Sequence, residues 1–121
     1  MDYQIEKGMI ISVDLNPTKG SETGKIRPCL VVTNDIYNKR VPIIQVVPIT
    51  EWSDKKGLIK TNVTIKPDHQ NGLTKKSIAD CLQTRPIDYA TRIVKTIGRV
   101  DNETLKKVNT ALKIVFGLDL Q

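Results

Sequence analysis

The sequence is poor in side chains that bind transition metals, because it has two cysteines and one histidine. Cys29 and Cys81 are too far apart for the spacing of a structural zinc site. His69 is the single imidazole of the chain, which excludes any mechanism that needs two histidines in one protomer. It lies in a turn-rich segment, so a surface position is predicted. We therefore expect no metal and no cofactor.

Long apolar runs are also missing, since no stretch approaches the roughly 20 residues that cross a bilayer. The first residues show no basic region followed by an apolar one, so no secretory signal is expected. Cys29 and Cys81 lie in apolar strand patterns and are predicted to be buried thiols in a reducing compartment. These patterns indicate a protein without membrane contact.

The length and net charge of the chain limit the number of domains and the kind of partner that are expected. The chain has 121 residues with 39% hydrophobic content, which predicts one folded domain over residues 1–121. Nineteen lysines and arginines against thirteen acidic residues give a net charge of +6. This excess favours an anionic partner, either a nucleic acid or an acidic protein segment.

Short apolar segments separated by turn residues predict a mainly β protein with a C-terminal helix. Such a pattern is typical of a small β-barrel or curled sheet closed by a helix. Pro48 indicates an edge strand or a bulge, and short helical turns are predicted at 34–40 and 86–90. A charged loop is expected at 51–60. The six predicted strands cover residues 9–15, 29–33, 43–50, 62–66, 77–83 and 92–100.

The last segment changes to helical periodicity. Asp101 or Asn102 is a suitable N-cap, and Gly117 is a suitable terminator. The expected function of the apolar stripe between them is core packing. That stripe consists of Leu105, Val108, Leu112, Val115 and Phe116.

The segment Gly20–Pro28 is the most informative part of the chain, because it is too polar and too glycine-rich to be core. Gly20 and Gly24 allow sharp bends or close approach of a ligand to the backbone. Pro28 biases Arg27 towards an extended conformation where the second strand begins. Taken alone, the segment is more typical of a solvated hairpin loop with scattered charges, because most loops only connect other elements.

A second polar residue is expected beside this loop. In an antiparallel meander the start of one strand lies beside the end of the next strand. Arg27 begins the second strand and Thr50 ends the third. We therefore predict that the two side chains meet at one rim, under the Gly20–Gly24 segment.

These residues resemble the MazF/PemK family of toxin endoribonucleases. The resemblance depends on Gly20-Ser21-Glu22, on Gly24-Lys25-Ile26-Arg27-Pro28 and on Val47-Pro48-Ile49-Thr50, which occur in the family order. It extends from about Lys7 to Leu120, and the two loop motifs together are fairly specific. It implies an SH3-like barrel of the MazF/CcdB type, usually assembled as a homodimer.

The resemblance also implies an activity. Members of the family are cytoplasmic toxins that cleave single-stranded RNA, often mRNA, at a short base sequence and without a metal, which inhibits translation. The expected products are a 2′,3′-cyclic phosphate and a 5′-OH. The implied partner is a cognate antitoxin whose acidic disordered segment occupies the RNA-binding surface.

The resemblance further implies site residues. Arg27 matches the catalytic arginine of the family, and Thr50 matches the threonine that partners it. Ser21 and Glu22 match loop residues of the active site, and Gln83 matches a residue near the substrate. One branch of the family uses an arginine and an aspartate on the fifth strand, where this chain has Asp80 and Leu82. That version of the mechanism is therefore set aside, and Ser21 also replaces a histidine used there.

The chemistry of the side chains suggests their roles. The planar guanidinium of Arg27 suits a phosphate, but its pKa above about 12 makes it a poor general acid. Thr50 suits a hydrogen bond to phosphate or to Arg27. Glu22 is either the proton acceptor or an ion-pair partner that fixes Arg27 or Lys25.

Further RNA contacts are predicted around these residues. Lys19, Lys25 and Arg85 are candidates for phosphate contacts, although each is also compatible with a solvated surface charge. Trp52 is either a platform that stacks on an unpaired base or a lid over the core.

Two alternatives from other classes remain open at this level. One is a toxin on the same barrel that poisons DNA gyrase without catalysis, and the other is an RNA-binding barrel without cleavage. The loop arginine together with Thr50 favours the nuclease, because a gyrase poison needs no guanidinium that faces phosphate.

Overall fold

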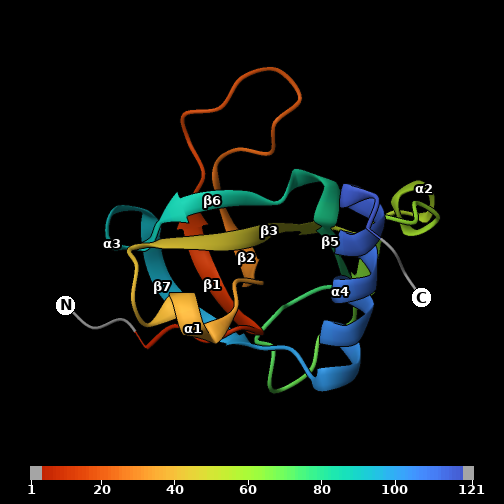
Figure 1. Cartoon of the computed structure of the whole chain (residues 1–121). Coiled ribbons are helices and arrows are strands. Elements are labelled where there is room, and N and C mark those ends of the chain that lie inside the picture. The colour runs from red at the N-terminus through yellow and green to blue at the C-terminus, as the bar shows by residue number, and fades with distance from the viewer. Residues whose placement is uncertain (1–3, 119–121) are drawn as a thin grey trace.

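The computed structural model describes residues 4–118, in which a strongly curled antiparallel sheet is closed at one end by a long helix (Figure 1). The strands of this sheet follow the order β4-β5-β3-β2-β1-β7, and β6 pairs with β3 outside that path. This confirms the predicted mainly β fold with a C-terminal helix. The strands are β1 (Met9–Asp14), β2 (Ile26–Val31), β3 (Ile43–Glu51), β4 (Asn62–Ile65), β5 (Ser77–Asp80), β6 (Arg85–Asp88) and β7 (Ile93–Arg99).

Short helices occupy several connections, and one long helix ends the described chain. The one-turn helix α1 occurs at the predicted position between β2 and β3. The charged loop predicted at 51–60 contains another helical turn, α2, which Ser53 caps by accepting a hydrogen bond from the Lys56 N–H. The helices are α1 (Asp35–Asn38), α2 (Asp54–Gly57), the 3-10 turn η1 (Cys81–Gln83), α3 (Tyr89–Arg92) and α4 (Asn102–Phe116).

Strand β3 is the common neighbour of three other strands. It pairs with β2 on one side, and on the other side it pairs first with β6 and then with β5. Pro48 lies where the neighbour changes from β6 to β5, so its missing N–H interrupts no continuous ladder. Of the two alternatives predicted for Pro48, the edge strand is wrong, because β3 is an interior strand.

The region after β5 also differs from the prediction. The fifth strand ends at Asp80 rather than at 83, because the chain turns into η1 there. The helical turn predicted at 86–90 is displaced: Arg85–Asp88 pairs with β3 as β6, and the turn begins only at Tyr89. The Asp88 carboxylate caps that turn by accepting hydrogen bonds from the N–H groups of Ala90 and Thr91.

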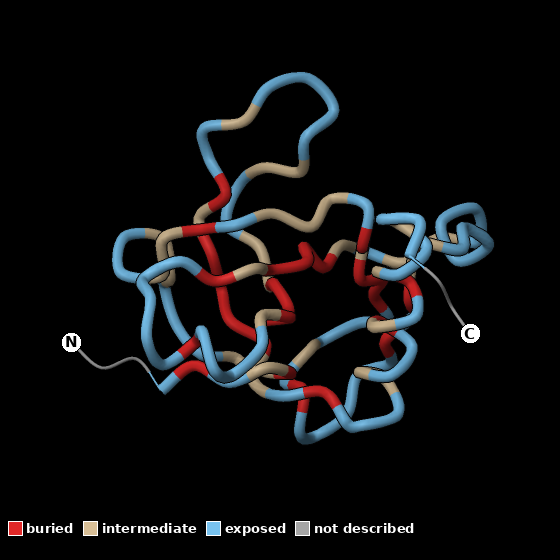
Figure 2. Tube along the Cα trace, viewed as in Figure 1, coloured by how far each residue is buried: buried red, intermediate tan, exposed pale blue. Residues whose placement is uncertain are grey.

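Both faces of the sheet carry buried apolar side chains. Figure 2 shows the buried residues along the strands. Side chains of β1 alternate between two apolar clusters, so both of its faces are covered. Ile10 packs in the cluster under α4, while Ile11 and Val13 pack inside the curl of the sheet. Cys29 and Cys81 are buried free thiols, as predicted, and burial raises the pKa of each to about 12.

Helix α4 begins and ends at the predicted residues. The Asp101 side chain accepts a hydrogen bond from the Thr104 N–H, and Gly117 closes the helix with φ +66°. Val108 is fully buried, but Phe116 is 61% exposed. The prediction that Phe116 packs in the core is therefore wrong. Ala111, which was not part of the predicted stripe, is buried in the core cluster.

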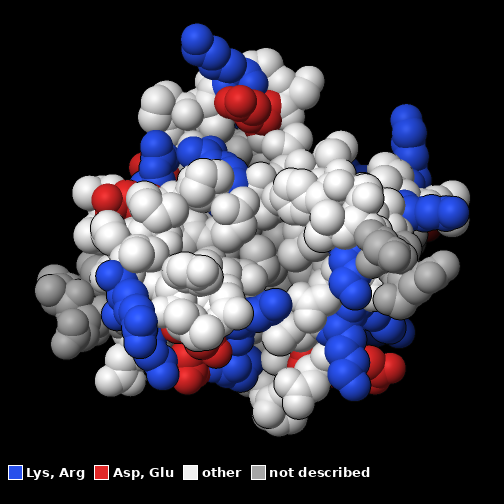
Figure 3. All heavy atoms as spheres, in the orientation of Figure 1, with Lys and Arg blue, Asp and Glu red and all other residues white. Residues whose placement is uncertain are grey.

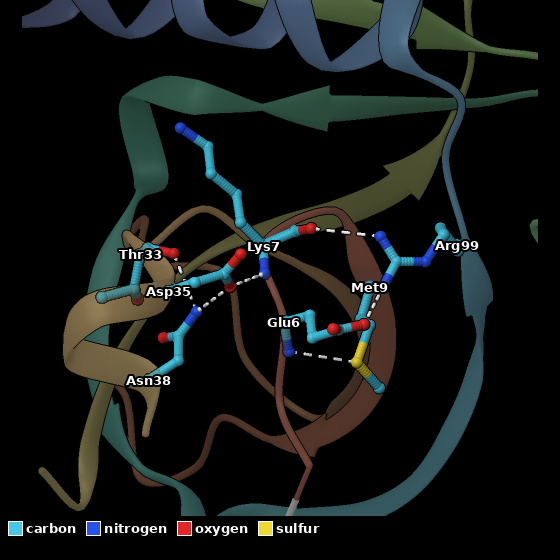
Figure 4. A network of polar contacts seen from close by, with 7 residues as sticks. All are labelled: Glu6, Lys7, Met9, Thr33, Asp35, Asn38 and Arg99. Atoms are coloured by element: carbon cyan, nitrogen blue, oxygen red, sulfur yellow. Dashed lines mark hydrogen bonds and ion pairs between the residues drawn. The ribbon is translucent and has the colours of Figure 1, made fainter. Parts of the chain in front are cut away.

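The segment before β1 is fastened by polar contacts (Figure 4). The Lys7 N–H donates to the Asp35 carboxylate at 2.7 Å, and this hydrogen bond lowers the pKa of Asp35. The Asn38 amide donates to the same carboxylate at 3.1 Å. On the other side, Arg99 of β7 forms an ion pair with Glu6 and donates to the Lys7 carbonyl.

Candidate functional site

A cavity of about 580 Å³ lies between the β1–β2 loop and one face of the sheet. The loop itself projects away from the sheet (Figure 1). Strands β2, β3, β4 and β5, the helix α2 and the turn η1 each contribute to the lining. Both Arg27 and Thr50 are among the lining residues, together with Ser21, Glu22 and Gln83. The fold thus brings five of the nine predicted site residues to one cavity.

Strand register explains why Arg27 and Thr50 share this cavity. Cys29 of β2 pairs with Pro48 of β3, and continuing this antiparallel register by two residues sets Arg27 opposite Thr50. Thr50 in turn pairs with Ile78 of β5. Opposed residues on neighbouring strands point to the same face of a sheet, so the three side chains lie in one row.

The same register adds residues from the two following strands. Asp80 lies two positions after Ile78 and therefore points to the same face. Asn62 of β4 is paired with Asp80, and both line the cavity. The polar face therefore runs across β2, β3, β5 and β4.

Arg27 is held by the loop that precedes it. Its Nε–H donates to the Gly24 carbonyl oxygen at 2.9 Å, and its guanidinium is half-buried. Within residues 4–118 no hydrogen bond or ion pair involves its two Nη groups. A positive group fixed at one nitrogen and unpaired at the other two is suited to an anionic ligand.

The bends of the loop fall only partly at the predicted glycines. Gly20 has φ +55°, as its predicted conformational freedom allows, but the other left-handed residue is Lys25 with φ +67°. Gly24 is needed for a different reason, because its backbone packs closely against neighbouring side chains. A Cβ there would lie 2.6 Å from the Thr18 Oγ1 and 2.8 Å from the Asn16 Oδ1.

Gln83 and Arg85 hold the loop from the side of β6. The Gln83 side chain accepts a hydrogen bond from the Thr23 N–H at 3.3 Å and donates one to the Ser21 carbonyl at 3.2 Å. The Arg85 Nη1 donates to the Leu15 carbonyl at 3.0 Å. Both residues were predicted to contact substrate. In the structure Gln83 contacts the loop and also lines the cavity, whereas Arg85 contacts the base of the loop.

Glu22 does not make the ion pair that was one of its two predicted roles. Its carboxylate accepts a hydrogen bond from the Lys19 N–H at 2.8 Å, and its own N–H donates to the Lys19 carbonyl at 3.1 Å. No ion pair joins it to Arg27 or Lys25. Glu22 therefore closes a turn within the loop while its side chain borders the cavity.

The remaining predicted residues lie away from the cavity. Lys19 and Lys25 are exposed on the loop and do not line it. Trp52 is half-buried beside α2, with the Lys76 ammonium 3.7 Å from its ring centroid and Gly57 packed against its indole nitrogen. Trp52 is thus held beside α2 and is not among the described residues that pack against either core cluster.

Asn62 and Asp80 line the cavity but were not among the site residues predicted from the sequence. Asp80 is half-buried, and desolvation raises the pKa of its carboxyl. The backbone amides of Gln83 and Leu82 and the Lys56 ammonium partly offset this effect. The alternation Ser77–Asp80 was the available signal, but it needed the pairing with β3 to reveal which face was the site.

Residues 4–118 contain neither a metal-binding cluster nor a membrane-spanning helix. No group of three or more His, Cys, Asp or Glu side chains in this part of the chain is arranged to hold a metal ion. Nor does any helix there have the length and apolar character of a membrane span.

The curled sheet, the closing helix and the polar cavity define a small SH3-like barrel with a basic loop over one face. The family described as "PemK-like, MazF-like toxin of type II toxin-antitoxin system" matches residues 6–116. The chain belongs to this family.

Two curated endoribonucleases are similar in sequence to this chain over most of its length. The Endoribonuclease EndoA of Bacillus subtilis is 36% identical over 114 residues, which cover 94% of this chain and 96% of that protein. The Endoribonuclease MazF of Staphylococcus saprophyticus is 33% identical, with coverages of 94% and 92%.

Solved structures share the fold. MazF from Deinococcus radiodurans superposes with a TM-score of 0.81 at 24% identity and covers 97% of this chain and 100% of its own. An endoribonuclease from a mycobacterial species, crystallised with its cognate antitoxin, has a TM-score of 0.74 at 22% identity, covering 95% of this chain and 97% of its own.

Proposed function

We propose that this chain is the toxin of a type II toxin–antitoxin pair and that it cleaves single-stranded RNA. The observation that carries the proposal is the row formed by Arg27 and Thr50 on the cavity face, with the guanidinium anchored through Nε at Gly24. Homologous endoribonucleases at 36% and 33% identity support the same reaction class. The fold accommodates the alternatives of a gyrase poison or a passive RNA-binding barrel, but the anchored arginine favours chemistry on phosphate.

The reaction proposed is an attack of the ribose 2′-OH on the adjacent phosphorus. The P–O5′ bond breaks, and the products are a 2′,3′-cyclic phosphate and a 5′-OH. Arg27 binds the non-bridging phosphate oxygens and stabilises the charge of the phosphorane. Thr50 donates a hydrogen bond to the same phosphate. DNA lacks the attacking hydroxyl and is not cleaved.

The loop is proposed to carry the substrate backbone over this cavity. Ser21, Lys19 and Lys25 are exposed along it, and Glu22 keeps its turn closed through the Lys19 N–H. Basic side chains also lie on the loop and along α4 on the face shown in Figure 3. Such contacts give affinity that falls with salt, whereas preference for a base sequence requires contacts to base edges in the cavity.

The proposed partners follow from the family and the charge. A net charge of +6 suits both RNA and an acidic disordered antitoxin segment. We further propose a homodimer that acts in the cytoplasm, where the two buried thiols stay reduced.

A cleavage assay tests the proposal. Purified protein is incubated with a long single-stranded RNA in EDTA, and the fragment ends are mapped. Discrete fragments with 5′-OH and cyclic phosphate ends are expected, while single-stranded DNA of the same sequence stays intact. Uncut RNA combined with inhibition of DNA gyrase would support the gyrase poison instead, and uncut RNA with tight binding would support the passive barrel.

A further inference from the structure

The cavity contains a carboxyl group that none of the predicted roles uses. Asp80 ends β5 on the face shared by Thr50 and Asn62, and it lines the same cavity as Arg27. Its side chain is half-buried, in contrast to most acidic residues of a protein surface. A carboxyl on a rigid strand beside a phosphate-binding arginine is well placed for proton transfer.

The other two carboxylates of the cavity are engaged elsewhere. Glu22 is exposed and accepts the Lys19 N–H at 2.8 Å. Glu51 is exposed and pairs with the Lys75 ammonium at 3.4 Å. Asp80 is therefore the one acidic group among the described lining residues that combines partial burial with a position on the sheet floor.

We propose that Asp80 is the proton acceptor of this site, and that it takes the proton of the attacking ribose 2′-hydroxyl. This assignment rests on the proposed RNA cleavage. In the step, the O2′–H bond breaks and its proton moves to the Asp80 carboxylate as the O2′–P bond forms. The P–O5′ bond then breaks, and the departing 5′ oxygen takes a proton from water. Glu22 takes no part in this proton transfer and instead keeps the turn of the loop closed through its hydrogen bonds with Lys19.

Burial and the neighbouring groups of Asp80 set the strength of this acceptor. Burial raises the pKa of its carboxyl, which makes the ionised form a stronger base. The Lys56 ammonium and the backbone amides of Gln83 and Leu82 limit the rise. The other charged groups of the cavity are Arg27, Glu22 and Glu51, and the Cys81 thiol beside Asp80 has a pKa of about 12 and stays neutral.

The test is the pH profile of single-turnover cleavage in EDTA with the full chain. For wild type, the rate is expected to rise about tenfold per pH unit on the acid side and then to level. Asp80→Asn is expected to lose this acid limb and to cleave about 100-fold more slowly at pH 8. Asp80→Glu is expected to retain the limb and part of the rate. Glu103→Gln, an exposed carboxylate on α4, is the matched control and keeps the wild-type profile.

Binding separates chemistry from affinity. A 2′-O-methyl RNA, which cannot react, is expected to bind Asp80→Asn at least as tightly as wild type, because removing a negative charge does not weaken the attraction for phosphate. Lost binding would make Asp80 a substrate contact and overturn the proposal.

Each failure has a distinct signature. Wild-type rate and an unchanged acid limb in Asp80→Asn would overturn the assignment and leave the nuclease standing. Wild-type protein that cleaves no RNA would overturn the proposed function itself. If Asp80→Asn does not fold, the wild-type profile decides, because the absence of an acid limb at every pH at which the protein stays folded would exclude a carboxylate acceptor.

Discussion

The Nε–H of Arg27 donates to the carbonyl oxygen of Gly24 at 2.9 Å, which links the first residues of β2 to the loop before them. A side chain with four torsions is thereby fixed at its planar end. Fixing a long side chain before the ligand arrives reduces the entropy lost on binding. The orientation of the guanidinium thus depends on a backbone group only three residues away.

Arg27→Lys is expected to reduce cleavage about 100-fold or more. An ammonium lacks both the Nε donor to Gly24 and the bidentate grip on phosphate. The measurement is single-turnover cleavage of a long RNA, with circular dichroism to show that the fold persists. Lys95→Ala, which removes an exposed positive charge from β7, is the control and should cleave normally. Equal activities of Arg27→Lys and wild type would contradict the role given to the guanidinium.

Gln83→Ala is expected to loosen the loop. The substitution removes the acceptor of the Thr23 N–H and the donor to the Ser21 carbonyl, each worth roughly 0.5–1.5 kcal/mol. Faster amide hydrogen exchange in a peptide covering residues 18–25 is the expected result, together with slower cleavage. Leu82→Ala alters the exposed neighbouring side chain and should change neither quantity. Unchanged exchange in Gln83→Ala would mean that the loop keeps its shape without this residue.

Asp80→Asn is expected to raise the thermal midpoint at pH 7. The folded state raises the pKa of this carboxyl, so it binds the proton more tightly than the unfolded chain does. Ionisation at neutral pH therefore costs stability, and the amide avoids this cost. The gain should vanish as the pH falls below the unfolded pKa of about 3.9, because both states are then protonated. Thermal melts of both proteins between pH 3 and 7 measure the difference, and a destabilised variant at pH 7 would refute the argument.

Asp35→Asn is expected to show the opposite dependence on pH. The Lys7 N–H lowers the pKa of the Asp35 carboxyl, with smaller help from Asn38, Lys39 and Arg99. A depressed pKa stabilises the fold above the unfolded value of about 3.9, and this contribution disappears as the pH falls through the folded value. Urea unfolding should therefore show wild type more stable than Asp35→Asn at pH 7, and the gap should close towards pH 3. A gap of constant size would assign the loss to geometry rather than to charge.

Much of the site could be predicted because its signals are local. Pro28 biases the backbone of Arg27, and the end of an apolar strand indicates Thr50, so both residues follow from neighbours in the sequence. The ends of α4 were predicted for the same reason, since Asp101 and Gly117 act on adjacent residues.

The rest required contacts between distant segments. Asp80 belongs to the site only because β5 pairs with the second half of β3. Pro86 indicated a turn, yet the segment pairs with β3 as β6. The exposure of Phe116 is likewise not revealed by its place in the helical period of the stripe.

The two buried thiols have a practical consequence for spectroscopy. Cys29 and Cys81 are fully buried with pKa values of about 12, so they are almost entirely in the unreactive thiol form at neutral pH. A cysteine introduced at an exposed loop position such as Lys19 would then be the residue that a maleimide dye labels selectively. The two natural cysteines would therefore add little labelling of their own, and the fluorescence of the dye would report on the loop as RNA binds and dissociates.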